Sequence, residues 1–238
     1  MKIAVLMGGI SSEKDVSMRT GNAILNALQE LKYDAFPIVL EEGKILQQLQ
    51  SAEYDTAFIA LHGEYGEDGR IQAVLDILGK KYTGCGLIAS AITIDKEFTK
   101  KLILHEGIKV PKTYKSAEEI DKYPVVIKPS LEGSSVGLHI CNNIEEAKAA
   151  IAKLDGKKLS IEQFVKGEEI TVGVLNGEAL GVLKIMPKSG VYDYKSKYTK
   201  GETEFQFPAL LAEGMYEKAM KTAEKISMAL ELKGAPRI

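Results

Sequence analysis

The sequence has few cysteines, no long apolar run and no excess of positive charge, and each absence excludes a class of protein. Cys85 and Cys141 are too few for a disulfide framework, which is typical of a reducing cytosol. No apolar stretch approaches the roughly 18 residues of a membrane span, and residues 3–7 are too short for the apolar core of a signal peptide. A formal charge of −2 and a pI near 6.0 provide no broad basic field for nucleic acids or anionic membranes. We therefore expect a cytoplasmic protein that acts on small molecules, without nucleic-acid or membrane partners.

The chain is long enough for two or three domains, and its first third alternates between strand and helix patterns. It has 238 residues, of which 45% are hydrophobic and 27% charged, as is ordinary for a globular protein. Continuous apolar runs lie at residues 3–7, 35–40 and 56–61. This alternation predicts a parallel sheet with helices on its faces. The first helix is expected to bury Ile24, Ala27, Leu28 and Leu31.

Two Gly-rich loops follow strands of the predicted sheet. Residues 8–15 lead from a strand into a helix, a geometry that presents N–H groups and a positive helix end to a ligand. Glu13 lies in this turn, either as a favoured helix-start acid or as a carboxylate that binds a substrate ammonium. Residues 62–69 follow the third strand, where open α/β sheets place ligands. His62 either satisfies backbone groups there or belongs to a site.

A single helix is predicted over residues 87–106, because Ile94, Phe98 and Leu102 are spaced four residues apart. Lys96 lies near the start of this helix, beside Asp95. Most lysines are plain surface charges, so the residues alone leave Lys96 open between that interpretation and a role in binding.

The most distinctive stretch is KPSLEGSSVG, residues 128–137, which lies between two short apolar runs. This pattern predicts a hairpin with a polar tip. Small residues let a backbone approach a ligand closely, successive N–H groups form an anion-binding concavity, and Lys128 adds a positive charge. Phosphate is the expected ligand, although a flexible tip that binds nothing also fits the loop alone. The P-loop pattern GxxxxGK[ST] is absent.

The last third combines strand patterns with isolated acids. Residues 159–164 alternate as a strand that carries Glu162, and Glu169 follows shortly afterwards. Acids at strand ends are usually solvated, so neither indicates a site by itself. Asn176-Gly177 predicts a tight hairpin turn.

The end of the chain contains a long loop, a helix and the start of a strand. Residues 190–207 are polar and aromatic, with no clear helix or strand, and we expect them to act as a lid. A long helix is predicted over residues 213–232, and a parallel strand begins at residues 236–238. Because a parallel strand that stops at once is an unusual terminus, we expect a fragment of a longer protein.

Several short motifs are spread over the whole chain. They are GGISSE (8–13), ALHGEYGEDG (60–69), YTG (82–84), DK (95–96), KPSLEGSSVG (128–137) and YDYxxKY (192–198). Together, and in this order, they resemble the D-alanine–D-alanine ligase family of the ATP-grasp superfamily. The resemblance implies an α/β fold with a Rossmann-like parallel sheet in an N-terminal substrate domain (1–90), a central α+β ATP-grasp lid domain (91–166) and an incomplete C-terminal ATP-grasp domain (167–238).

The same resemblance implies ATP-dependent ligation of two D-alanines through a D-alanyl phosphate, for peptidoglycan precursors. Lys96 and Lys128 would hold the nucleotide phosphates. The resemblance implies that the loop residues Ser134, Ser135 and Val136 cover these phosphates. It assigns the adenine amino group and ribose to Glu162 and Glu169, and the adenine linker to Phe164 and Val165.

For the amino-acid substrate, the resemblance implies that Glu13 receives the ammonium of the first D-alanine. Ser134 and Tyr198 would hydrogen-bond to Glu13, and His62 would lie beside that substrate. The resemblance further places Lys197 near the transferred phosphoryl group and Arg237 at the oxyanion of the tetrahedral intermediate.

One departure concerns Mg²⁺. In the family, the acids that bind it lie after the strand that begins at Arg237, so we assign no metal ligand to this chain. Without Mg²⁺ to bridge the phosphoryl oxygens, turnover should be lost or nearly so, and the chain alone is expected to be inactive.

Two alternatives remain. A D-alanine–D-lactate ligase would share everything except acceptor choice, but Tyr198 after Lys197 resembles the dipeptide-forming type. A nucleotide-binding fragment without catalysis is the other alternative, which a phosphate-release assay separates from an active enzyme. The resemblance also favours a homodimer formed through the N-terminal domain.

Overall fold

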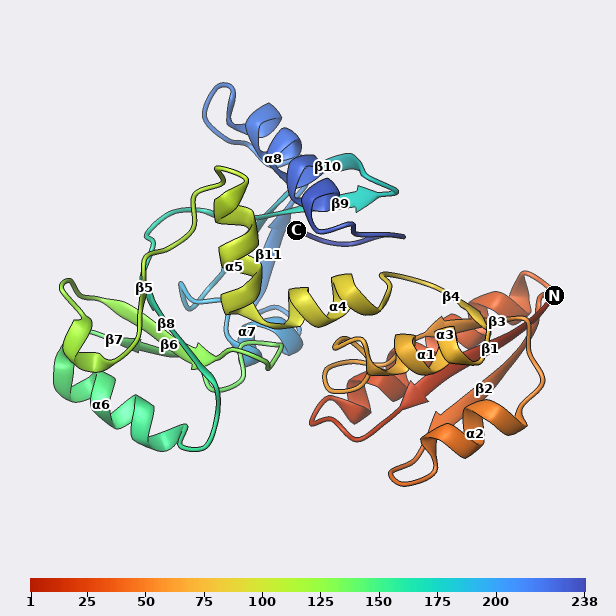
Figure 1. The fold of residues 1–238 in the computed structure, drawn as a ribbon. Coiled ribbons are helices and arrows are strands. Elements are labelled where there is room, and N and C mark those ends of the chain that lie inside the picture. Colours follow the sequence, from red (N-terminus) through yellow and green to blue (C-terminus); the bar gives the residue numbers. More distant parts are fainter. The chain divides into compact units, whose positions relative to one another are not determined.

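The computed structural model describes residues 1–238, and the chain divides into two compact units (Figure 1). The first unit contains Met1–Thr93 and Glu231–Gly234, and the second contains Ile94–Leu230 and Ala235–Ile238. The predicted further division of the second unit after residue 166 stays a prediction. No helix combines the length and the apolar character needed to cross a membrane.

The first unit contains a four-stranded parallel sheet. The strands are β1 (Lys2–Gly8), β2 (Asp34–Leu40), β3 (Thr56–Ile59) and β4 (Lys81–Tyr82), in the order β2-β1-β3-β4. Strand β1 is central and almost entirely buried, as its unbroken apolar run predicts. The predicted parallel sheet is confirmed.

The sheet separates two apolar clusters. One includes residues of α1 (Lys14–Glu30), and the other includes residues of α2 (Ile45–Ser51) and α3 (Arg70–Ile77). Helix α4 (Leu87–Ile94) follows β4 in the chain. The predicted buried face of α1 is partly wrong, since Ala27 and Leu31 are exposed. The helix instead buries Ser17, Gly21 and Leu25. A Cβ added at Gly21 would lie 2.5 Å from the Cβ of Met7, so the close approach of α1 to β1 requires a small residue there.

The predicted single helix over residues 87–106 is wrong, because the chain forms α4 and then α5 (Lys96–His105). Asp95 between them is extended, with φ −88° and ψ 101°, and its carboxylate accepts hydrogen bonds from the first turn of α5. The apolar face predicted for this helix is also largely exposed: Phe98 is 52% and Leu102 42% accessible.

The second unit contains two antiparallel sheets. The first consists of β5 (Thr113–Tyr114), β6 (Val125–Pro129), β7 (His139–Cys141) and β8 (Leu159–Gln163), in the order β5-β8-β6-β7. A short 3₁₀ helix, η1 (Ala117–Glu119), follows β5, and α6 (Ile144–Lys153) packs Ala147 and Ala150 into the core of this sheet. The predicted hairpin around residues 128–137 is confirmed, with Val125 opposite Cys141.

The second sheet consists of β9 (Glu169–Leu175), β10 (Glu178–Pro187) and β11 (Thr203–Gln206), in the order β11-β10-β9. Helix α8 (Met215–Ala229) packs Ala223 against it. The predicted Asn176-Gly177 turn is confirmed, and its φ angles of 49° and 90° suit a tight hairpin.

Two expectations for this part of the chain are wrong. Residues 190–207 contain α7 (Tyr194–Tyr198) and β11, because Asp193 caps α7 through Ser196 N–H and β11 pairs with β10. The final segment, residues 236–238, lies antiparallel to β9 rather than parallel to a neighbour, with Arg237 opposite Gly173.

Candidate functional site

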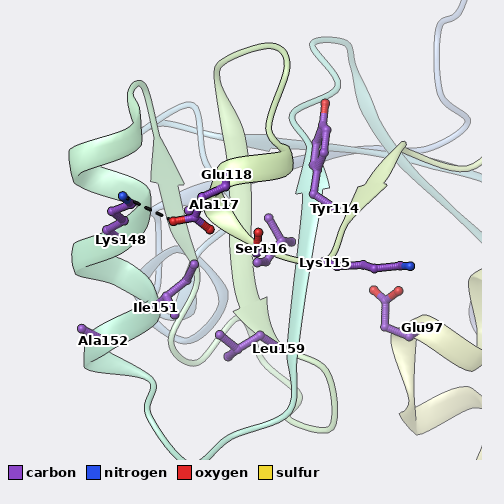
Figure 2. A pocket seen from close by; sticks show the side chains of 11 residues that line it. Glu97, Tyr114, Lys115, Ser116, Ala117, Glu118, Lys148, Ile151, Ala152 and Leu159 are labelled. Carbon is purple, nitrogen blue, oxygen red and sulfur yellow. Dashed lines mark ion pairs between the residues drawn. The ribbon is translucent and has the colours of Figure 1, made fainter.

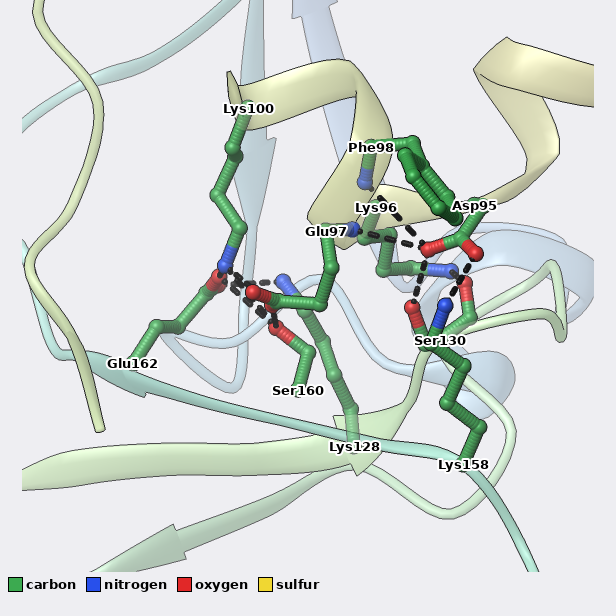
Figure 3. Close-up of polar contacts among 10 residues, drawn as sticks. All are labelled: Asp95, Lys96, Glu97, Phe98, Lys100, Lys128, Ser130, Lys158, Ser160 and Glu162. Carbon is green, nitrogen blue, oxygen red and sulfur yellow. Dashed lines mark hydrogen bonds and ion pairs between the residues drawn. The ribbon is translucent and has the colours of Figure 1, made fainter. Parts of the chain in front are cut away.

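Strand β8 presents two buried polar side chains to helix α5 (Figure 3). Because successive side chains of a strand point to opposite faces, Ser160 and Glu162 share one face while Leu159 and Ile161 share the other. Ser160 is fully buried and Glu162 is 8% exposed. Lys100 of α5 donates to Ser160 Oγ at 3.0 Å and to Glu162 Oε2 at 2.8 Å. The pairing of α5 with β8 therefore builds one buried polar network.

Lys128, near the end of β6, forms an ion pair with the other carboxylate oxygen of Glu162. Burial alone would raise the pKa of Glu162, but the charges and hydrogen bonds of Lys128 and Lys100 hold that pKa below its usual value. Glu162 therefore stays ionised at neutral pH. The structure brings together two residues that the resemblance assigns to the nucleotide.

Asp95 supports the same network from the start of α5. Its Oδ1 accepts from Glu97 N–H at 3.0 Å and from the Ser130 hydroxyl at 2.8 Å, and its other oxygen pairs with Lys158. Burial opposes ionisation, but these hydrogen bonds, led by the one from Lys158, leave the pKa of Asp95 below its usual value. The carboxylate thus connects the helix to the loop after β6.

Lys96 follows Asp95 directly and points its ammonium at that same loop. It donates to the carbonyl oxygens of Ser130 at 3.2 Å and of Glu132 at 2.6 Å. Burial, followed by the positive charge of Lys128, lowers the pKa of Lys96. Two mutually repelling ammonium groups at the edge of a Ser- and Gly-containing loop form a site that an anion would stabilise.

The loop itself contacts residues 190–198. Ser134 and Ser135 have left-handed φ angles of 52° and 57°, and Ser135 Oγ donates to Tyr192 O at 3.0 Å. The hydroxyl groups of Ser134 and Tyr198 lie 2.7 Å apart. The sequence predicts that successive N–H groups of this tip are open to a ligand. Val136 N–H is not, because it donates to Gly133 O within the loop.

A second group of predicted residues lies around β9. Partial burial raises the pKa of Glu169, while the charges of Lys197 and Arg237 act to lower it. The ammonium of Lys197 lies 5.1 Å from the ring centre of Tyr192. Backbone bonds between Ile238 and Val172 fix the segment that carries Arg237. Lys197 and Arg237 therefore both act on Glu169.

Phe164 and Val165 connect β8 with this region. The N–H of Phe164 donates to Pro124 O at 3.2 Å, and the side chain of Val165 is 65% exposed. Their assignment to the adenine stays a prediction.

The first unit brings together Glu13 and His62. Glu13 is 7% exposed, and a Cβ added at Gly63 would lie 2.9 Å from its Oε2. Ser11 joins the two loops, because its hydroxyl donates to His62 O at 2.6 Å and accepts from Glu13 N–H at 3.1 Å. The loops after β1 and β3 therefore meet at the carboxyl edge of the sheet, as the sequence predicts.

His62 is held between polar neighbours in this loop. Its Nδ1 lies 3.6 Å from Glu67 Oε1, and its Nε2 lies 3.2 Å from Thr20 Oγ1. The polar contact with Glu67 is the largest influence and raises the pKa of His62, burial opposes it, and the charges of Glu67 and Glu13 add to the rise.

A cavity of about 650 Å³ opens on the other face of β8 (Figure 2). Leu159 and Ile161 line it, the Lys148–Glu118 ion pair at 3.3 Å spans one side, and Glu97 lies at its edge. None of the residues predicted for the site lines this cavity.

The sequence does not single out Lys100 or Ser160, and Ser130 enters only as one residue of the stretch 128–137. Lys100 lies four residues after Lys96, which places both on one side of α5, but this spacing is also common among exposed lysines. The only useful signal for Ser160 is its alternation with Glu162 along the strand.

No three or more His, Cys, Asp or Glu side chains gather closely enough to hold a metal ion. The two cysteines are free thiols.

Comparison with known proteins gives the chain a family. The family models for the D-ala D-ala ligase N-terminus and C-terminus match residues 2–53 with 43–85 and residues 96–238. A D-alanine--D-alanine ligase of Fusobacterium nucleatum is 54% identical over this whole chain and 82% of its own length. Two crystal structures of the Bacillus anthracis D-alanine--D-alanine ligase also cover the whole chain. The first has a TM-score of 0.84 and 34% identity, with 81% of that chain covered. The second, complexed with ATP, has a TM-score of 0.83 and 31% identity, with 80% of that chain covered.

These structural neighbours share the mixed parallel and antiparallel sheets described above, which confirms the expected ATP-grasp architecture. The chain belongs to the D-alanine–D-alanine ligase family.

Proposed function

We propose that this chain carries the reaction of its family, the ATP-dependent joining of two D-alanines for peptidoglycan precursors. The observation that supports it most strongly is the cluster of Lys96 and Lys128 around Glu162 at the edge of a small-residue loop, in a chain 54% identical to a named ligase. Phosphoryl transfer depends on positioning and on neutralising charge, and such a cluster provides both.

For the nucleotide, Lys96 and Lys128 hold the phosphates, and Ser135 and Val136 cover them. The base and ribose lie along the strand connection that contains Glu162, Phe164, Val165 and Glu169. Both carboxylate oxygens of Glu162 accept from lysines, so a contact of Glu162 with adenine competes with those ion pairs. Phe164 and Val165, which follow directly in the chain, offer the apolar surface that a base needs.

For the amino acid, Glu13 receives the ammonium of the first D-alanine and His62 lies beside it. The burial of Glu13 at 7% exposure supports this role, because a buried carboxylate gains from a cationic partner. In the second unit, Ser134 and Tyr198 supply hydroxyl groups, Lys197 faces the transferred phosphoryl group and Arg237 faces the oxyanion.

The chemistry proceeds in two steps. A carboxylate oxygen of the first D-alanine attacks the γ-phosphorus, the bond to ADP breaks, and an acyl phosphate forms. The amine of the second D-alanine then attacks the acyl carbon, negative charge develops on its oxygen beside Arg237, and phosphate leaves as the amide forms. Because acyl phosphates hydrolyse readily, water must be kept out, and the hydrogen bond between Ser134 and Tyr198 joins the loop between β6 and β7 to helix α7.

Magnesium belongs to the expected chemistry, where it would neutralise the negative charge of the phosphoryl groups. The residues present do not provide a cluster of three or more ligands, so we assign no side chain of this chain to the metal.

We also propose a cytoplasmic homodimer. The two free thiols suit a reducing compartment. In the first unit, Ile77 is 84% and Ile88 70% exposed, which gives a partner apolar surface to cover. Light scattering after gel filtration measures the stoichiometry.

The nucleotide site is tested by Lys128→Ala, with isothermal titration of a non-hydrolysable ATP analogue with and without Mg²⁺. We expect affinity to fall at least tenfold, about 1.4 kcal/mol, because a charge-assisted contact to phosphate is lost. The exposed Lys122 in the same unit provides the control variant Lys122→Ala, which should bind like the parent chain. Equal affinities for both variants would contradict the assignment. A phosphate-release assay with D-alanine separates ligation from nucleotide binding alone.

A further inference from the structure

We infer that Lys100 is a positioning residue of the nucleotide site, which holds Glu162 so that Lys128 is able to exchange this carboxylate for a phosphate. The inference rests on the proposed function, since it concerns how the same site receives ATP. Lys100 itself does not touch the nucleotide in this proposal.

The first argument is the division of Glu162 between two lysines (Figure 3). Its Oε1 pairs with Lys128, and its Oε2 lies 2.8 Å from Lys100 Nζ. The side chains of Lys100 and Glu162 are 11% and 10% exposed, so neither charge is well solvated. Glu162 therefore needs a cation at all times, because an unpaired buried carboxylate is strongly destabilising.

The second argument is the number of hydrogen-bond donors that each lysine has in use. An ammonium has three N–H groups. Lys100 makes three contacts within the protein, at 2.7 Å to Glu97 Oε1, 3.0 Å to Ser160 Oγ and 2.8 Å to Glu162 Oε2. Lys128 has one such contact, to Glu162. Lys100 is thus saturated by fixed partners, while Lys128 keeps donors for a ligand.

The third argument is charge balance. Within the network, Lys100 and Lys128 balance Glu97 and Glu162, and Lys96 adds a further positive charge nearby. When Lys128 turns to a phosphate, Lys100 still contacts both carboxylates. Without Lys100, Glu162 would keep Lys128 as its ion-pair partner, and the exchange would leave a buried charge unpaired.

The test compares Lys100→Met with Lys101→Met, because Lys101 is the neighbouring exposed lysine and undergoes the same chemical change. Isothermal titration with ATP should show at least tenfold weaker binding for Lys100→Met and a change below twofold for Lys101→Met. Lys100→Arg should retain affinity within about threefold, since a guanidinium also reaches two carboxylates.

The pH dependence of binding distinguishes the positioning role of Lys100 from a merely structural one. In Lys100→Met, Glu162 loses one of the two cations that lower its pKa, so it becomes protonated in mild acid and releases Lys128. The ratio of the variant's dissociation constant to that of the parent chain should therefore shrink between pH 8 and pH 5. Taking the ratio at each pH removes the titration of ATP itself.

The outcomes are distinguishable. If the parent chain and Lys101→Met fail to bind ATP, the proposed function fails. If the parent binds and Lys128→Ala weakens binding, but Lys100→Met matches Lys101→Met or shows a pH-independent ratio, the positioning role of Lys100 is overturned. Should Lys100→Met not fold, Lys100→Gln, which keeps a donor for Ser160 but no charge, is judged by the same criteria.

Discussion

His62 carries a pH dependence that follows directly from its neighbour. Because the contact with Glu67 raises the pKa of His62, the folded chain stabilises the protonated ring relative to the unfolded chain. The stabilisation is fully present below the unfolded pKa of about 6.5 and is lost as the pH rises through the folded value. Proton NMR titration should therefore give His62 a pKa above 6.5, and Glu67→Gln should lower it.

The matched control is Glu64→Gln, in the same loop, because Glu64 pairs with Arg70 rather than with His62. A His62 pKa that responds equally to both variants would show that the general charge of the loop, and not the contact with Glu67, sets it.

At this scale the sequence predicts charged groups better than it predicts their partners. Lys96 and Lys128 lie in motifs and Glu162 is assigned through the family resemblance, and the structure places all three in one network. Lys100 is not found, because its partner Glu162 lies 62 residues away and only the packing of α5 on β8 joins them.

Helix α5 depends on Asp95 for its start. Asp95→Ala removes the cap, the acceptor for Ser130 and the partner of Lys158, so we expect a loss of about 2–3 kcal/mol in unfolding free energy. Urea unfolding followed by circular dichroism measures it. Asn143→Ala provides the control, because Asn143 caps α6 through Glu146 N–H and makes one further, exposed bond to the Glu146 carboxylate, so its loss should cost only about 1 kcal/mol. Equal losses would show that the extra contacts of Asp95 contribute nothing.

Elements with a strong periodic pattern are predicted correctly, and those decided by one side chain are not. The strands of the parallel sheet follow from unbroken apolar runs. The break at Asp95 is missed because the apolar spacing continues across it, although an aspartate is also a good cap. Residues 190–207 lack an apolar pattern since α7 is a short capped turn and β11 an edge strand.

The two units should respond differently to nucleotide. Every residue that we assign to ATP, including Lys197 at the transferred phosphoryl group, lies in the second unit. An ATP analogue at 100 times its dissociation constant stabilises the state that binds it by about 2.7 kcal/mol. Hydrogen exchange should therefore slow around β6, β8 and the loop after Lys128, with little change in the sheet of the first unit.

The control is Lys128→Ala at the same analogue concentration, which should remove most of the added protection. Protection that is equal in both units, or that survives this substitution, would contradict the assignment of ATP to the second unit.

At the scale of the whole molecule, the alternation of strands and helices predicts the first unit from sequence alone, whereas the architecture of the second follows only from resemblance. Short strands such as β5 and β7 are too brief for a periodic signal, and their order in the sheet is set by long-range pairing. The first division of the chain, after Thr93, lies three residues beyond the expected boundary.

The alternation along β8 has a consequence for any saturation library of this strand. The even-numbered positions 160 and 162 face Lys100 of α5. The odd-numbered positions 159 and 161 face the apolar core and the cavity. Substitutions at positions 159 and 161 should therefore be rare among variants selected for soluble expression. Substitutions at positions 160 and 162 should be rare among variants selected for nucleotide binding. In this short strand, the face on which a residue lies would decide whether its substitution impairs folding or nucleotide binding.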